Sequence, residues 1–200
     1  MKKIIFATTN QGKVREVKMM MEDFGVDFVT MKDAGIDIDI VEDGKTFEEN
    51  AIIKAKTIME ATGEIALADD SGLEVDYLDG APGIYSARFL GEDTSYDEKN
   101  KDIIEKLKDA KGKERSARFV CAMAVAFPNG EIETCRGTIE GLIGYEQKGK
   151  NGFGYDPIVY VPEYEMTTGE MAPELKNSIS HRGKALEQMK EILKRKLDLN

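Results

Sequence analysis

The spacing of apolar residues predicts alternating strands and helices along the first half of the chain. Residues 2–8 and 26–30 are short apolar runs of the kind found in strands. Residues 10–24 carry apolar side chains three and four positions apart, which is typical of one face of a helix. Capping-box patterns predict two more helices, at residues 46–62 and at residues 95–110.

A third strand is expected at residues 65–69, and it ends on two adjacent carboxylates, Asp69 and Asp70. Ser71 and Gly72 follow and predict a turn. Neighbouring side chains of a strand point to opposite faces, so both carboxylates can serve one site only if the strand stops there. Carboxylates at the end of such a strand favour a ligand site, whereas a solvated turn with two surface acids is the plain alternative.

The second half of the chain predicts a long antiparallel hairpin followed by short elements. Residues 115–127 alternate between apolar and polar, residues 128–130 have turn composition, and residues 131–143 predict the returning strand. A last short strand is expected at residues 158–161, and residues from 180 onward have helical periodicity. With no repeat or linker in between, the pattern indicates a mixed α/β fold in one continuous unit.

Composition restricts the function classes. The 200 residues carry a net charge of −10, and such an acidic chain is unsuited to binding the nucleic-acid backbone over a broad face. The two cysteines show no metal-binding or disulfide pattern and are expected to be reduced thiols. No apolar run resembles a signal peptide or a membrane span, so we expect a cytoplasmic protein with no membrane partner.

The first strand leads into a polar loop, residues 8–13, at the start of a helix. Free N–H groups at a helix N-terminus suit a phosphate, and Lys13 adds a full positive charge. The loop is not a Walker A motif, because Val14 follows Lys13 where a serine or threonine is needed. An Asn-capped helix with an exposed lysine is the alternative interpretation.

Three acidic residues are candidate ligands for Mg²⁺: Glu42, Asp69 and Asp70. Magnesium prefers carboxylate oxygens, retains several waters and often bridges to substrate phosphates. Taken alone, Glu42 has the features of a solvated acid in an acidic loop.

Phe153 lies between two glycines in a loop, where its ring could stack on a planar base or pack on the core. His181 and Arg182, at the start of the last helix, are possible donors to a carbonyl or phosphate oxygen. Surface or capping roles are the alternative for both.

In their order and spacing, six motifs resemble those of the inosine triphosphate pyrophosphatases, which remove non-canonical purine nucleoside triphosphates. The resemblance covers essentially the whole chain, and one mild departure is Thr9, where many members have glycine. The motifs lie at residues 7–13, 42–55, 68–76, 80–88, 152–157 and 176–183.

This resemblance implies a single domain over residues 1–200 with an elongated, two-lobed α/β fold. It implies a mixed sheet flanked by helices, a substrate cleft between the lobes, and usually a homodimer. The implied reaction is Mg²⁺-dependent hydrolysis between the α and β phosphates of ITP, dITP and XTP. The products are the monophosphate and pyrophosphate, which keeps these nucleotides out of DNA and RNA.

The resemblance also implies residue roles. Asp70 is the expected general base and holds the metal with Glu42, although Asp69 could replace or join Asp70. The residues expected to bind phosphates and sugar are Thr8, Thr9, Asn10, Gln11, Gly12, Lys13, Lys54, Ser71 and Lys176. Phe153 is expected to stack on the base, in a pocket completed by Gly154, Tyr155, Asp156, His181 and Arg182.

Two other functions stay open at this point. A nucleotide-binding regulator without catalysis is disfavoured by the presence of Asp70, Glu42 and Lys13. A Maf-like enzyme acting on pyrimidine or modified nucleotides is disfavoured by the motifs around Phe153 and Arg182.

Overall fold

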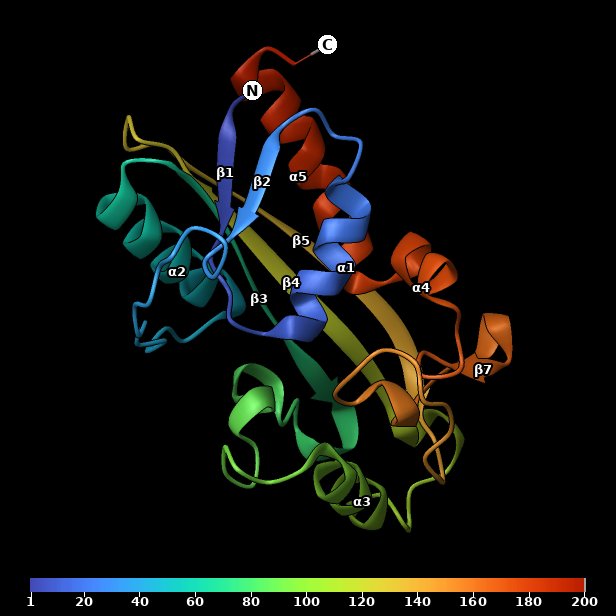
Figure 1. Cartoon of the computed structure of the whole chain (residues 1–200). Helices are drawn as coiled ribbons and strands as arrows, with labels where there is room; N and C mark the ends of the chain where they lie inside the picture. The colour runs from blue at the N-terminus through green and yellow to red at the C-terminus, as the bar shows by residue number, and fades with distance from the viewer. Residues whose placement is uncertain (200) are drawn as a thin grey trace. The chain divides into compact units, whose positions relative to one another are not determined.

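Seven strands form one mixed sheet with helices packed on it in the computed structural model, which describes residues 1–199 (Figure 1). The strand order is β2-β1-β3-β4-β5-β6-β7. The strands are β1 (Lys3–Phe6), β2 (Asp27–Thr30), β3 (Ile65–Val75), β4 (Ser116–Ala126), β5 (Ile132–Ile143), β6 (Val159–Val161) and β7 (Met166–Thr167). The α-helices are α1 (Gln11–Met21), α2 (Phe47–Thr62), α3 (Tyr96–Lys106), α4 (Pro173–Ile179) and α5 (His181–Leu197). The predicted mixed α/β class is confirmed.

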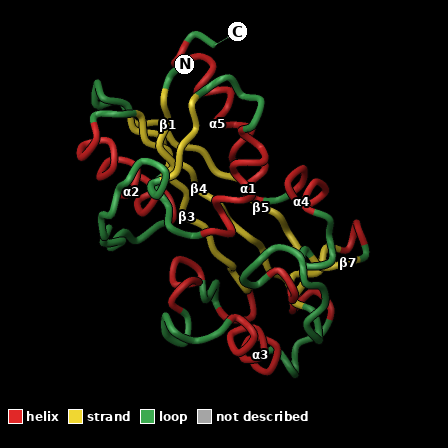
Figure 2. Tube along the Cα trace, in the orientation of Figure 1, coloured by secondary structure: helices red, strands yellow, loops and turns green. Residues whose placement is uncertain are grey.

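Pairing directions follow from the connections. Strand β1 is parallel to β2, with Lys3 opposite Asp27, and parallel to β3, with Ile4 opposite Ile65. Parallel neighbours need a crossover, and helices α1 and α2 provide it. Strand β6 pairs antiparallel with β5 and with β7. The long connection between β2 and α2 contains no helix or strand (Figure 2).

The chain divides into two compact units. Unit 1 comprises residues 1–70, 121–137 and 181–200, and unit 2 comprises residues 71–120 and 138–180. Strands β3, β4 and β5 contribute residues to both units. Within the described residues, no helix combines the length and the apolar character needed to cross a membrane.

Unit 1 has a different core on each face of its strands. Apolar residues of α1 and α5 pack with Phe6, Leu67 and Met123 on one face. Helix α2 packs on the other face, which is formed largely by alanines such as Ala66 and Ala124. Small side chains let α2 approach the strands closely, whereas larger ones fill the space under α1 and α5.

Strand β3 differs from the prediction, because it does not end at the paired carboxylates. It continues through Asp69, Asp70 and the Ser71–Gly72 pair as far as Val75. Leu73 and Val75 are completely buried in the core of unit 2. Their burial, together with pairing in the interior of the sheet, overrides the local turn preference of Ser-Gly.

In unit 2, a buried arginine completes the end of α3. Arg115 donates hydrogen bonds to the carbonyl oxygens of Leu107 at 2.6 Å and Ala110 at 3.1 Å. It also donates to Ile143 O at 2.7 Å and Gly144 O at 2.8 Å. Carbonyls at a helix end lack partners within the helix, so one guanidinium satisfies them and joins α3 to the end of β5.

The remaining elements follow the sequence with small shifts. The turn between β4 and β5 holds residues 128–130, since Phe127 N donates to Glu131 O at 2.9 Å. Both cysteines are free thiols, as expected. Helix α4 and strand β7 were not predicted, because each is too short to show a clear period.

Candidate active site

The paired carboxylates of β3 point to opposite faces of the strand, and each meets its own cations. Asp69 is completely buried, and its Oδ2 lies 3.2 Å from Lys13 Nζ and 3.2 Å from Arg182 Nε. Arg182 also donates to Glu16 Oε2 at 2.6 Å. Burial acts to raise the pKa of Asp69, but the charges of Lys13 and Arg182 outweigh it and hold that pKa well below its usual range.

Asp70 faces α2. Asn50 Nδ2 donates to Asp70 Oδ2 at 3.1 Å. Lys54 Nζ lies 3.7 Å from Asp70 Oδ1 and 2.6 Å from Glu42 Oε1. Burial raises the pKa of Asp70 although Lys54 opposes it, so Asp70 is the more basic of the two neighbouring carboxylates.

The ammonium of Lys54 contacts the carboxylates of both Glu42 and Asp70. Burial acts to lower the pKa of Lys54, but Asp70, Asp69 and Glu42 together raise it. A place where two carboxylates converge on a cation has the donor set that Mg²⁺ prefers. No group of three or more His, Cys, Asp or Glu residues that could hold a metal occurs among residues 1–199.

The loop before α1 is an Asn-capped helix start. Asn10 Oδ1 accepts hydrogen bonds from Gly12 N at 2.9 Å and Lys13 N at 3.2 Å, and Asn10 N donates to Thr8 Oγ1 at 3.2 Å. Asn10 therefore caps α1, as expected if this loop is an ordinary Asn-capped helix start. Lys13 is not the exposed lysine of that interpretation, since its ammonium lies against buried Asp69 and burial lowers its pKa.

His181 and Arg182 open α5, and both are buried. A glycine in β5 lets this helix end come close: a Cβ on Gly137 would lie 2.3 Å from His181 O and 2.6 Å from Ala185 N. This close packing of α5 on β5 positions the first turn of the helix, which carries Arg182, the partner of Asp69.

In unit 2, the loop around Phe153 is organised by the carboxylate of Asp156. Asp156 Oδ2 accepts hydrogen bonds from Phe153 N at 2.8 Å and Lys176 Nζ at 2.6 Å, and Oδ1 accepts from Thr168 Oγ1 at 2.8 Å. A Cβ at Gly152 would lie 2.0 Å from Oδ2, so glycine is needed for the carboxylate to fold under the loop. Lys176 Nζ lies 5.0 Å from the centroid of the Phe153 ring.

Tyr155 points into the core of unit 2. Its ring meets Tyr96 edge-on at 5.2 Å, and its hydroxyl donates to Ser86 O at 2.6 Å. The side chain itself is therefore a structural anchor, although its backbone belongs to the loop of Phe153.

The predicted site residues fall into one group per unit. The group in unit 1 contains Thr8, Thr9, Asn10, Gln11, Gly12, Lys13, Glu42, Lys54, Asp70, His181 and Arg182. The group in unit 2 contains Ser71, Phe153, Gly154, Tyr155, Asp156 and Lys176.

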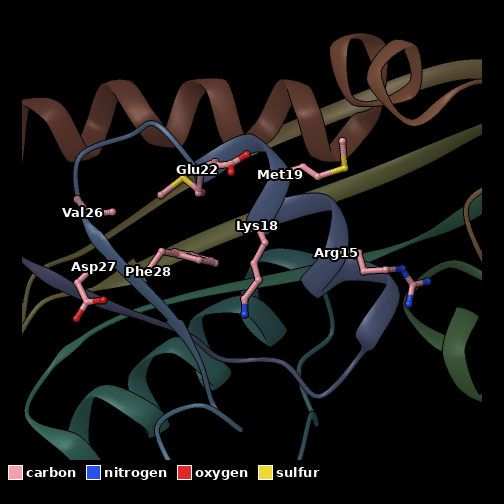
Figure 3. Close-up of a pocket in the computed structure, with 8 residues that line it drawn as sticks. Arg15, Lys18, Met19, Glu22, Val26, Asp27 and Phe28 are labelled. Carbon is pink, nitrogen blue, oxygen red and sulfur yellow. The ribbon is translucent and has the colours of Figure 1, made fainter.

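A hollow of about 720 Å³ lies beside the second half of α1 and the start of β2 (Figure 3). Its lining mixes cationic, anionic and apolar side chains, and it includes none of the predicted site residues. The lining residues are Arg15, Lys18, Met19, Met21, Glu22, Val26, Asp27 and Phe28.

Comparison with known proteins places the chain in a family. Residues 4–192 match the model of the Ham1 family. The chain belongs to the Ham1 family. A relative of this Ham1 chain, the dITP/XTP pyrophosphatase of Clostridium perfringens, is 49% identical over 97% of this chain and 98% of its own length. The dITP/XTP pyrophosphatase of Desulforamulus reducens is 50% identical, with 96% of each chain covered.

A solved structure agrees with this assignment. The HAM1 protein from Coxiella burnetii matches with a TM-score of 0.88 and 42% identity, covering 98% of this chain and 100% of the other. The resemblance inferred from the motifs is thus confirmed at the level of the family and the fold.

Several residues that shape the site in this Ham1 protein had no role in the sequence interpretation. Glu16 pairs with Arg182, Asn50 orients Asp70, and Thr168 bonds Asp156. The positions of Glu16 and Asn50 carry a weak signal, because they lie three and four residues from Lys13 and Lys54 on their helices. Thr168 lies in a segment for which no helix or strand was predicted, and its position carries no comparable signal.

Proposed function

We propose that this chain hydrolyses dITP, XTP and ITP to the nucleoside monophosphate and pyrophosphate. Similarity to dITP/XTP pyrophosphatases over almost the whole chain carries this proposal. The protein is a nucleoside triphosphate pyrophosphatase of non-canonical purine nucleotides, a hydrolase that keeps them from polymerases.

For the reaction, we assign Asp70 as the base that accepts a proton from the attacking water. The water oxygen forms a bond to the α-phosphorus, the bond from that phosphorus to the bridging oxygen breaks, and pyrophosphate leaves. The hydrogen bond from Asn50 Nδ2 orients the Asp70 carboxylate for this role. Lys13 and Lys54 supply positive charge for the phosphates.

Glu42 and Asp70 are the residues that would hold Mg²⁺, because both already converge on the ammonium of Lys54. When bound, the ion neutralises phosphate charge and polarises the water. Lys54, whose ammonium contacts both carboxylates, would supply positive charge for a phosphate oxygen.

For the base, we propose that Phe153 stacks on the purine and that His181 and Arg182 donate to the 6-oxo group. Glu16 and Asp69 fix the guanidinium of Arg182 in advance. Adenine presents an amino group at that position, so a fixed donor would face another donor and reject it. We also propose, on the family resemblance, a homodimer in the cytoplasm.

The test is product analysis with XTP, dITP, ITP, GTP, ATP, UTP and dTTP, each with Mg²⁺ and with chelator. Pyrophosphate from XTP, dITP and ITP alone, lost on chelation and in Asp70→Asn, is the expected result. Orthophosphate as product would contradict cleavage at the α phosphorus. Turnover of UTP or dTTP would indicate the Maf-like alternative. Thermal stabilisation by XTP without turnover would indicate a binding protein.

A further inference from the structure

The hydroxyl of Tyr155 connects the loop of Phe153 to a separate turn of unit 2. The side chain is only 4% exposed, and its hydroxyl donates to Ser86 O at 2.6 Å. Burial raises the pKa of Tyr155, so the hydroxyl keeps its proton and remains a donor. The edge-on contact with Tyr96 restricts the ring.

The acceptor end of this link is itself firmly held. Ser86 Oγ accepts a hydrogen bond from Leu73 N at 2.9 Å and donates to Gly83 O at 2.6 Å. Next to it, Ala87 O accepts from Lys99 Nζ at 2.6 Å. Leu73 lies in β3, three residues beyond Asp70, so the turn at residues 83–88 is attached to the strand that carries the proposed base.

The loop end of the link contains two glycines in the left-handed region of backbone conformation. Gly152 and Gly154 adopt φ values of +71° and +64°, which side chains with a Cβ rarely adopt. Hydrogen bonds hold the loop at other points: Phe153 N donates to Asp156 Oδ2, and Asn100 Nδ2 donates to Gly154 O at 3.2 Å. The position of the Phe153 ring therefore depends on such anchors rather than on the stiffness of the backbone.

We propose that Tyr155 is a positioning residue for base selectivity: through Ser86 it sets the plane of Phe153 relative to β3. This rests on the proposed function, in which Phe153 stacks on the base. A misplaced ring would still stack on any purine, but it would not bring the 6-oxo purines into register with their donors. The hydroxyl thus affects the choice among planar purine bases and has no part in the bond-breaking step.

The test compares Tyr155→Phe with Tyr77→Phe, which removes a hydroxyl from a residue that is 45% exposed and lies outside the site. Loss of one buried hydrogen bond is expected to raise KM for XTP about fivefold to tenfold. The ratio of kcat/KM for XTP to that for ATP, whose base carries a 6-amino group, should fall by a similar factor. We expect kcat to stay within about twofold and Tyr77→Phe to behave as wild type.

Further results distinguish a failure of the positioning role of Tyr155 from a failure of the proposed base site. An unchanged XTP to ATP ratio in Tyr155→Phe, with a lower melting temperature, would mean that the hydroxyl only stabilises the fold and would overturn the proposal. Phe153→Ala tests the foundation: if it leaves KM for XTP unchanged, stacking by Phe153 and the proposed base site are wrong. A large effect of Phe153→Ala with none of Tyr155→Phe would refute the positioning role alone.

Discussion

Replacing Asp69 by asparagine should destabilise this protein severely. The substitution keeps the volume of the side chain but removes the negative charge beside partly buried Lys13 and buried Arg182. Glu16 still pairs with Arg182. Removing one member of a buried ion network costs about 3–5 kcal/mol. For a chain of this size, 1 kcal/mol lowers the melting temperature by about 2–4 °C, so we expect a drop of about 6–20 °C.

The assays are urea denaturation and thermal melting of the ligand-free protein, with Asp70→Asn as the matched control one residue away. Burial raises the pKa of Asp70, which means that its surroundings disfavour its charge. Its neutral replacement should therefore cost less than about 1 kcal/mol while removing activity. If Asp69→Asn also lost less than 1 kcal/mol, the buried network would not be a main source of stability and the reasoning would be refuted.

Three further predictions concern stability. Gly137→Ala should cost about 1–3 kcal/mol in urea denaturation, because its Cβ would lie 2.3 Å from His181 O; unchanged stability would contradict the close approach. Thr168→Val should cost about 1–3 kcal/mol by removing the donor to Asp156 Oδ1, and Thr168→Ser should restore it; equal losses in both would contradict this cause. Burial raises the pKa of Cys135 to about 12, so its contribution to stability is present below pH about 8.5 and is lost as pH rises toward 12. A thiol reagent at pH 8 should therefore modify half-buried Cys135 more slowly in the native protein than in urea, and equally rapid modification of the native protein would contradict the raised pKa.

The sequence predicted the long elements well because their signals are local. Thr46 Oγ1 accepts from Glu49 N at 3.1 Å, Gly63 ends α2 with a φ of +68°, and the apolar stripe of α1 faces the core. These features depend on residues within a few positions of each other. Helix α4 and strand β7 have no comparable local pattern.

Long-range partners could not be predicted in the same way. The ion pair of Lys13 depends on Asp69, which lies far along the chain, and the environment of Asp156 depends on Thr168 and Lys176. The roles of these charges follow from packing between segments rather than from any spacing in the sequence. The motif resemblance predicted site roles for several of them but could not say which of their side chains pair with one another.

The error about β3 shows how the two carboxylates acquire different properties. Alternation along a strand was the correct rule, and only the assumption that the strand ended at Asp69 was wrong. Because the strand continues, Asp69 lies under α1 and α5 between two cations, whereas Asp70 lies under α2 beside Asn50 and Lys54. Two adjacent residues of one strand thus differ: the charge of Asp69 is stabilised by its two cations, whereas burial disfavours the charge of Asp70, the proposed base. A chemical role for Asp70 therefore requires no unusual local backbone, only a strand that is covered by a different helix on each face.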